Sequence, residues 1–285
     1  MLEATFQIST GIDWRMERRL WRSGIKRWQD LLDLGSHPHI SKRHLRKLKK
    51  KIMKYKTALK NENFEYFLTE IPSGLVWRAF PNLIRKILYF DVEATGLNKD
   101  EDEITTISTY DGENIRCFVN GDNLSDFPDY ADEFSAICTF DGERLDIPLI
   151  NKQLGYYFSH IHFDLFQLSR ILGVRGGLKK IERRMGVDRD PLIKEINGKS
   201  AIFLWKEYQK SRDNRFLETL LAYNIEDVIH LEEMLYLFYN ELRKKYRLPV
   251  ARIRYPKKDI ENPKNIYSIT IKTINSKYFP EQKVN

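Results

Sequence analysis

The segment Leu88-Tyr89-Phe90-Asp91-Val92-Glu93-Ala94-Thr95-Gly96-Leu97 joins an apolar run to two acids and a Thr-Gly turn. Its apolar residues predict a buried strand over residues 86–92. Residues i and i+2 of a strand face the same side, so Asp91 and Glu93 present two carboxylates together at the end of this strand. Two like charges repel unless a cation neutralises them, and a divalent metal ion is the natural partner. Taken alone, such a pair is more often a solvated strand end.

Two other segments place acids where they could meet this strand. Tyr223 and Asp227 are four residues apart in a helix predicted over residues 215–246, so they share one face at the edge of its apolar stripe. Asp146 follows an apolar strand predicted over residues 135–140 and a glycine turn, where a helix can begin. Each pattern is weak by itself, because amphipathic helices and strand ends produce acids by chance.

After the strand over residues 86–92, the sequence predicts a strand hairpin, another strand and then helices. This order of elements predicts an α/β or α+β fold. Asp111-Gly112 between two strand-like runs is a strong hairpin signal. The further predicted strands cover residues 103–110 and 113–120, and the further predicted helices cover residues 164–172, 178–185 and 199–210.

Together the three acidic segments resemble the motifs of the DEDD superfamily of 3′–5′ exonucleases. Asp91 and Glu93 stand at the acids of its first motif, and Asp146 stands at the acid of its second. Tyr223 and Asp227 match the third motif in its tyrosine form. The resemblance implies an α/β fold: an RNase H-like mixed sheet flanked by helices, here preceded by a small all-helical domain.

A narrower resemblance is to the YprB-type exonuclease family. It covers residues 85 to about 245 and rests on three stretches: His162–Leu165, Gly176–Glu182 and Leu204-Trp205. Asp141 stands where this family usually has Asn, so we expect it to disturb the approach of the substrate or to recruit another cation. The segment between residues 120 and 135 is short for the family's intervening helix.

The resemblance implies two bound Mg²⁺ or Mn²⁺ ions, about 3.5–4 Å apart, acting on the attacking water and the leaving 3′ oxygen. Asp91, Glu93 and Asp227 would hold one ion. Asp91 would hold the second together with Asp146, directly or through water. The metal site is therefore expected to draw its ligands from one strand and two helices.

The resemblance also implies how the substrate is held. Tyr223 would hydrogen-bond the attacking water or the scissile phosphate, and Thr95 and Leu97 would line the pocket for the terminal nucleotide. The sequence therefore predicts a metal-dependent 3′–5′ exonuclease, with DNA favoured over RNA as substrate. A structure-specific endonuclease or an RNA exonuclease with the same site remains an alternative, as does a non-catalytic nucleic-acid-binding protein.

The chain's positive charge is concentrated at its N-terminal end. The whole chain has a net charge of +8, and residues 1–80 contain 17 Lys+Arg against 8 Asp+Glu. The stretch from Ile8 to Trp28 resembles a helix-hairpin-helix, in which the turn at Gly11 offers backbone N–H groups to a phosphate. Asp13 occupies the place of the usual second glycine, so a structural or protein-docking role is the alternative for Gly11.

A helix predicted over residues 41–59 is the stronger indication of nucleic-acid binding. Residues 42–60 contain ten Lys/Arg and no acid. We expect Lys42, Arg43, Arg46 and Lys47 to contact phosphates, the alternative being a solvated face. The predicted organisation is a helical module over residues 1–80, a nuclease domain over 81–247 and a basic tail over 248–285, in which residues 267–274 could add a strand. The module or the tail could also bind a protein partner.

The remaining signals concern cysteines, histidines and membranes. Cys117 and Cys138 form no CxxC pair, so we expect core residues in a reducing, cytoplasmic setting. His160 and His162 could ligate a metal, but we expect them to end a strand, and we expect Asp164 to cap a helix or support the metal ligands. There is no run of about 18 apolar residues and no apolar signal-peptide region, so no membrane association is expected.

Overall fold

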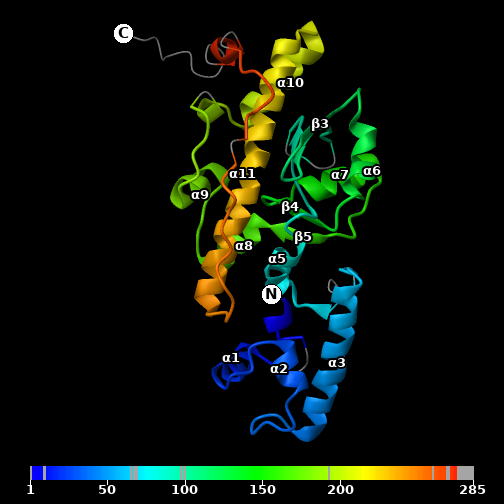
Figure 1. Ribbon diagram of the computed structural model, residues 1–285. Helices are drawn as coiled ribbons and strands as arrows, with labels where there is room; N and C mark the ends of the chain where they lie inside the picture. Colours follow the sequence, from blue (N-terminus) through cyan, green and yellow to red (C-terminus); the bar gives the residue numbers. More distant parts are fainter. Residues whose placement is uncertain are drawn as a thin grey trace.

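Figure 1 shows a β-sheet flanked by helices, with a smaller helical part at the N-terminal end of the chain. The helix-period and strand-period patterns of the sequence account for both parts.

In the part of the chain that the structure describes, no helix is long and apolar enough to cross a membrane. The computed structural model describes residues 2–8, 11–64, 66, 70–96, 98, 101–191, 193–258, 260–267 and 270–274.

The sheet contains five strands: β1 (Ile87–Ala94), β2 (Ile104–Tyr110), β3 (Ile115–Val119), β4 (Ala136–Thr139) and β5 (Ile161–Asp164). Their order in the sheet is β3-β2-β1-β4-β5. β1, β2 and β3 form an antiparallel meander, whereas β4 and β5 run parallel to β1. Gly112, with a φ of 100°, makes the turn between β2 and β3 as the Asp-Gly signal predicted. This mixed sheet confirms the predicted fold class.

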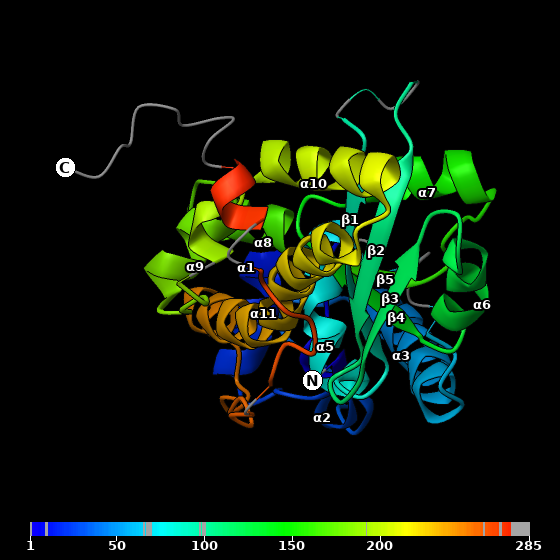
Figure 2. The same cartoon turned by 90° about the horizontal axis from the view of Figure 1, so that it is seen from above.

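Helices cover both faces of the sheet (Figure 2). Among the described residues, six α-helices belong to this part: α6 (Phe127–Ala131), α7 (Asp146–Leu154), α8 (Leu165–Leu172), α9 (Leu178–Met185), α10 (Gly198–Ser211) and α11 (Asn214–Tyr246). Leu88 and Phe90 of β1 pack on the side of α6 and α7, whereas Tyr89 belongs to the core that includes α11. Asp91 and Glu93 follow Tyr89 at intervals of two residues, so all three side chains lie on the same face of the strand. Both carboxylates therefore point toward α11. Short 3-10 helices precede α6 at Leu124–Asp126 and α10 at Ile193–Glu195.

The N-terminal part contains η1 (Leu2–Ala4), α1 (Trp14–Arg22), α2 (Trp28–Leu32) and α3 (Lys42–Lys60), followed by η2 (Ser73–Ala79) and α5 (Phe80–Leu83). α3 is capped by Ser41, whose hydroxyl accepts from the N–H of His44. Its apolar stripe is buried at Leu45, Leu48, Ile52 and Tyr55. The sequence also predicts a short helix around residues 64–69, most of which lie outside the described ranges.

Buried contacts through η2 tie the N-terminal part to the sheet. Arg78 donates to both carboxylate oxygens of Glu17 in α1, at 2.9 and 3.0 Å, and each of the two side chains is 1% exposed. The neighbouring Trp77 stacks on Tyr246 of α11 with ring centroids 5.9 Å apart. One apolar core therefore continues from α1 through η2 to α11. The division into separate domains near residue 80 stays a prediction.

The segment after α11 is packed along that helix as far as the structure describes it. The Lys258 ammonium pairs with Glu232 at 2.8 Å and donates to the carbonyl of Gly112 at 2.5 Å. The strand expected over residues 267–274 is wrong, because residues 270–274 are helical. Thr270 hydrogen-bonds Thr219 of α11 at 2.9 Å, so contacts with α11 outweigh the strand propensity of this β-branched run.

Candidate active site

Three carboxylates that are far apart in sequence meet where β1 faces α11. One oxygen each of Asp91, Glu93 and Asp227 lies within 4.8 Å of the others. Asp91 and Glu93 share a face of β1, and Asp227 projects from α11, which packs against that face. The side chains that the sequence places on one face of a strand (i and i+2) and on one face of a helix (i and i+4) thus meet at one point.

Asp146 and Tyr223 line the same pocket, which has a volume of about 750 Å³. Asp146 is the first residue of α7 and lies outside the group of three acids. Its Oδ2 atom is buried and has no hydrogen-bond partner among the described residues. A buried carboxylate oxygen without a donor indicates a missing cation or water. The structure thus brings all five predicted catalytic residues to one pocket.

The pKa values of these acids reflect first their burial and then their mutual repulsion. Burial, then Asp146 and Asp227, raise the pKa of Asp91 well above its usual value. Burial, then Asp227 and Asp146, do the same for Glu93. Such acids ionise readily only when a cation compensates them, and carboxylate oxygens are the ligands that Mg²⁺ and Mn²⁺ prefer. The donor set therefore fits a divalent cation.

Asn224 holds Asp91 in place, a contact that the sequence analysis did not anticipate. Its side-chain nitrogen donates to Asp91 Oδ2 at 2.8 Å, and its oxygen accepts from the Thr106 hydroxyl at 3.2 Å. Asn224 is fully buried in α11. The available signal was a polar amide beside Tyr223 in an apolar helix, since a buried amide needs a specific partner.

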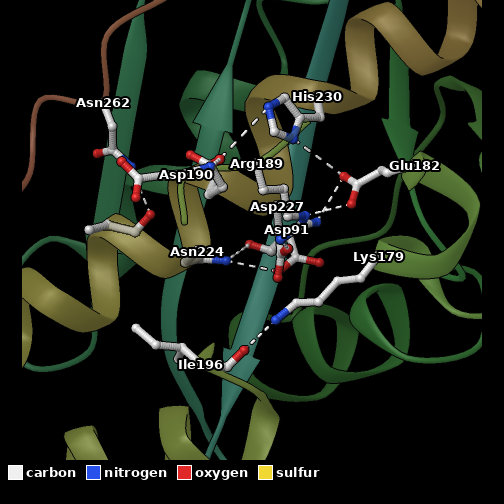
Figure 3. A network of polar contacts seen from close by, with 12 residues as sticks. Asp91, Lys179, Glu182, Arg189, Asp190, Ile196, Asn224, Asp227, His230 and Asn262 are labelled. Atoms are coloured by element: carbon white, nitrogen blue, oxygen red, sulfur yellow. Dashed lines mark hydrogen bonds and ion pairs between the residues drawn. The ribbon is translucent and has the colours of Figure 1, made fainter. Parts of the chain in front are cut away.

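Arg189 pairs with Asp227 and was also missed (Figure 3). Two further nitrogens of the same guanidinium bind Glu182 of α9, at 2.5 and 2.8 Å. His230 lies 3.4 Å from the same Glu182 carboxylate. This buried network of side-chain contacts fixes the orientation of Asp227. Arg189 follows α9 in a stretch without any motif, so the sequence offered no signal for it.

Lys179 brings a second cation to the site. Its ammonium donates to the carbonyl of Ile196 and lies 4.8 Å from the centre of the Tyr223 ring. Burial lowers the pKa of Lys179, while Asp227 raises it. Burial, then Asp227, raise the pKa of Tyr223 well above its usual value, so its hydroxyl stays protonated and can donate.

The start of α10 lines the pocket. Asn197 caps this helix, accepting from the N–H groups of Lys199 and Ser200 at 3.0 and 3.2 Å. Asn197, Gly198 and Lys199 line the pocket together with the acids. The positive end of the α10 dipole therefore adjoins the carboxylates, where it favours an anionic substrate group.

Thr95 and Leu97 are the two residues predicted to hold the terminal nucleotide. Thr95 donates to Asp102 at 2.8 Å and accepts from the N–H of Glu103 at 3.0 Å, so it stabilises the turn after β1. Its neighbour Gly96 lines the pocket, and a side chain there would meet Asp102 at 2.4 Å. Leu97 lies outside the described residues.

Asp164 caps α8, as predicted, and supports the turn that precedes Asp146. Its Oδ1 accepts from the N–H of Phe166 at 2.8 Å and from that of Asp141 at 3.0 Å. Asp141 has a φ of 64°, and its carboxylate accepts a hydrogen bond from Nε of Arg144 in the same turn at 3.1 Å. The effect of Asp141 on the substrate or on a bound cation stays a prediction.

The predicted place of the histidines is wrong, because His160 and His162 flank the first residue of β5 rather than its end. They hydrogen-bond Ala131 O at 3.0 Å and Thr139 Oγ1 at 2.8 Å. Cys138 is buried and Cys117 is partly buried, and both thiols are free.

The predicted nucleic-acid-binding residues lie on the N-terminal part, away from the pocket. Gly11 has a φ of +87°, and a side chain there would meet the ring of His44 at 2.7 Å. The basic face, as we call the four exposed residues near the start of α3, consists of Lys42, Arg43, Arg46 and Lys47. The positive φ and the close approach of His44 explain the glycine, whereas phosphate binding by either group stays a prediction.

The family model of the RNase_H superfamily matches residues 88–239, which include β1 except its first residue, the other four strands and most of α11. The chain belongs to this superfamily. A solved structure titled "apo form of the nuclease" is 20% identical, with a TM-score of 0.44, and covers 62% of this chain and 81% of its own. A family B DNA polymerase from the hyperthermophilic archaeon Pyrobaculum calidifontis is 13% identical, with a TM-score of 0.35. It covers 60% of this chain, and the match spans 31% of the polymerase. No curated protein sequence matches this chain.

Proposed function

We propose that this protein is a metal-dependent nuclease that removes nucleotides from the 3′ end of nucleic acid. The observation that carries the proposal is the convergence of Asp91, Glu93 and Asp227 within 4.8 Å, in a pocket that Asp146 and Tyr223 also line. Membership of the RNase H superfamily supports a nuclease. The direction of cleavage, the two-metal scheme and the resemblance to the tyrosine-form DEDD and YprB-type enzymes belong to the proposal.

Asp91, Glu93 and Asp227 would hold one divalent ion, and Asp91 with Asp146 a second. Bound there, such ions would polarise the scissile phosphate and lower the pKa of a bound water. Asn224 fixes Asp91, and Arg189 fixes Asp227, so that the carboxylates are oriented before an ion binds. Hydrogen bonds of this kind commonly change metal affinity or activity by about 10–100-fold.

Tyr223 would act on the substrate through its hydroxyl. Its raised pKa keeps the phenol neutral, so it donates a hydrogen bond to the attacking water or to a phosphate oxygen. The first turn of α10 lines the pocket together with the acids and would receive the phosphate of the terminal nucleotide. Apolar residues, Phe140, Leu145 and Leu149, line the same pocket and provide a surface for the terminal base.

We further propose that the basic face of α3 holds the longer part of the substrate and that DNA is preferred to RNA. The four side chains of this face are exposed, and none forms an ion pair within the described part of the chain. Exposed cations of this kind bind the phosphate backbone without reading its sequence. A protein partner on this part of the molecule would be the competing occupant.

The test uses end-labelled oligonucleotides of one sequence as DNA and as RNA, with Mn²⁺ or with EDTA. We expect 3′-labelled DNA to release labelled mononucleotide at once, 5′-labelled DNA to shorten stepwise, and EDTA to stop both. Asp91→Asn serves as the inactive control. Cleavage of circular single-stranded DNA would show an endonuclease instead, and faster digestion of RNA would reverse the proposed preference.

A further inference from the structure

A second cavity, of about 590 Å³, lies between the end of α8, α9 and the C-terminal half of α11. Asn240 of α11 lines it and is 13 residues beyond Asp227, so the cavity lies about 20 Å along the helix from the carboxylates. Four cations line this cavity against a single acid, Glu241. We call these four residues the cationic lining: Arg184, Arg243, Lys244 and Arg252.

The charges of the cationic lining are not neutralised by the protein. In the described ranges no carboxylate forms an ion pair with any of the four. Arg184 donates to the carbonyl of Arg175 at 3.0 Å, and Arg243 donates to that of Val250 at 2.9 Å. A carbonyl group has no net charge, so these hydrogen bonds orient the two guanidinium groups without neutralising them. Four like charges around one cavity repel, and an anionic ligand would relieve that repulsion.

One donor of a residue that lines this cavity is left without a partner. Nε of Arg243 is buried and makes no hydrogen bond to any described residue. An Arg side chain has five N–H donors, and a buried one is ordinarily paired. A guanidinium can bind the oxygens of a phosphate group in a bidentate manner, and the carbonyl of Val250 holds only the Nη1 nitrogen of Arg243.

The remainder of the lining is mainly apolar. Leu172, Val174, Met185 and Leu237 contribute to the same cavity. A cationic lining combined with apolar side chains fits a ligand in which a phosphate is joined to a flat apolar ring. Inorganic phosphate would use the cations alone, whereas a nucleotide would use both kinds of surface.

We propose that this cavity is a second binding site, separate from the carboxylate pocket, and that it takes the phosphate and base of a nucleotide. The nucleotide has two possible sources: one unit of a bound polynucleotide strand, or a free nucleoside monophosphate. The first source rests on the proposed nuclease function, and the second is independent of it.

The test compares the wild-type chain with a Lys244→Gln/Arg252→Gln variant, whose two side chains make no hydrogen bond within the described residues. Lys206→Gln/Lys210→Gln is the matched control, because it removes the same charge from exposed positions of α10. Both variants are measured in EDTA, with 5′-AMP by calorimetry and with a fluorescent 24-nucleotide DNA by anisotropy at several salt concentrations. Circular dichroism checks that each variant is folded.

For the free nucleotide we expect at least about tenfold weaker binding of 5′-AMP in the variant and no change in the control. For a polynucleotide unit we expect the slope of log affinity against log salt to fall by about 0.7 in magnitude, since the variant loses the contact with the one phosphate in the cavity and each single-strand phosphate contact contributes about 0.7. A change in either measurement supports the site and identifies its source. No change in either, or equal losses in the control, would overturn it.

Failure of this proposal can be told apart from failure of the proposed function. The variant should hydrolyse a trinucleotide in Mn²⁺ at the wild-type kcat, because so short a substrate cannot reach both cavities. If the wild-type chain hydrolyses nothing but the variant still loses 5′-AMP binding, the second site stands and the nuclease proposal falls. Arg184→Gln provides a further variant within the cationic lining and should weaken the same binding step.

Discussion

The side chain of Asn224 donates a 2.8 Å hydrogen bond to Oδ2 of Asp91, joining two residues that are 133 positions apart in the sequence. This contact fixes one carboxylate of the cluster through a neutral donor, so it adds orientation without adding charge. It also sets the register of α11 against β1, because the next residues along the same helix bring Asp227 to the cluster. A single amide thus links the packing of the core to the geometry of the proposed metal site.

Replacing Asn224 by Ala should loosen Asp91 without removing any carboxylate. We expect Mn²⁺ affinity and turnover to fall by about 10–100-fold, the usual range for groups that orient a metal ligand. Calorimetric titration with Mn²⁺ and hydrolysis of 3′-labelled DNA measure the two effects. Thr106→Val, which removes only the partner of the Asn224 oxygen, should give a smaller loss. Unchanged Mn²⁺ affinity in Asn224→Ala would contradict this role.

The carboxylate cluster should make the metal-free protein more stable at mildly acidic pH. The folded-state pKa of Asp91 is raised, so the folded chain binds more protons than the unfolded chain in the window between the two pKa values. Stability therefore rises as pH falls through this window, and it levels off near pH 4, below which the unfolded acid is protonated too. Thermal unfolding in EDTA between pH 4.5 and 8 measures this dependence.

Asp91→Asn should remove part of that pH dependence and raise the Tm of the metal-free protein at pH 7.5. Relief of about 1 kcal/mol of repulsion corresponds to about 2–4 °C for a chain of this size. The same variant should lose turnover by several orders of magnitude and should no longer be stabilised by Mn²⁺. A lower Tm in EDTA would mean that Asp91 is held as a structural acid rather than as a metal ligand.

Tyr223→Phe removes one hydroxyl and leaves the ring that packs beside Lys179. We expect turnover to fall by about 10–1000-fold, because a single oriented donor to a reacting group contributes an effect of that order. Mn²⁺ affinity should stay within about twofold, since the phenol is not a proposed ligand. Single-turnover hydrolysis and metal titration separate the two quantities. A large loss of Mn²⁺ binding would place Tyr223 among the metal ligands instead.

Arg189 and Glu182 should behave as one unit. Arg189→Met leaves Glu182 buried without its main partner, so we expect a loss of about 3–5 kcal/mol in the free energy of unfolding. The double variant Arg189→Met/Glu182→Gln should recover part of this stability but not the activity, because Asp227 has still lost its positioning residue. Urea unfolding of both single variants and the double variant gives the coupling energy. Additive losses would show that the two side chains act independently.

Neutralising the basic face of α3 should affect binding rather than chemistry. With Lys42, Arg43, Arg46 and Lys47 changed to Gln, we expect a higher KM on long DNA, a flatter salt dependence and a kcat close to wild type. Deleting the N-terminal part is a poorer test, because Trp77 and Arg78 anchor it in the continuous core. KM is measured for both proteins at 50 mM and at 200 mM salt. If the variant has the same KM as the wild type at each concentration, this face docks a protein or is merely solvated.

Much of the architecture could be predicted because its signals are local. The strand over residues 86–92 became β1, and the helix over residues 215–246 became α11, each to within two residues at either end. Hydrophobic periodicity reports which face of an element is buried, and the Asp-Gly turn reports where the chain reverses. The failures fell where packing competes with propensity, as in residues 270–274, where a β-branched run became helical against α11.

The sequence by itself determined which acids could act together, because their spacings place Asp91 with Glu93 and Tyr223 with Asp227 on common faces. Only the tertiary structure decided what holds those acids. Asn224 reaches Asp91 across 133 residues and Arg189 reaches Asp227 across 38. Such pairings depend on how α11 and the loop after α9 pack against β1. No periodicity encodes them, since the free energy that selects them comes from burying whole surfaces together.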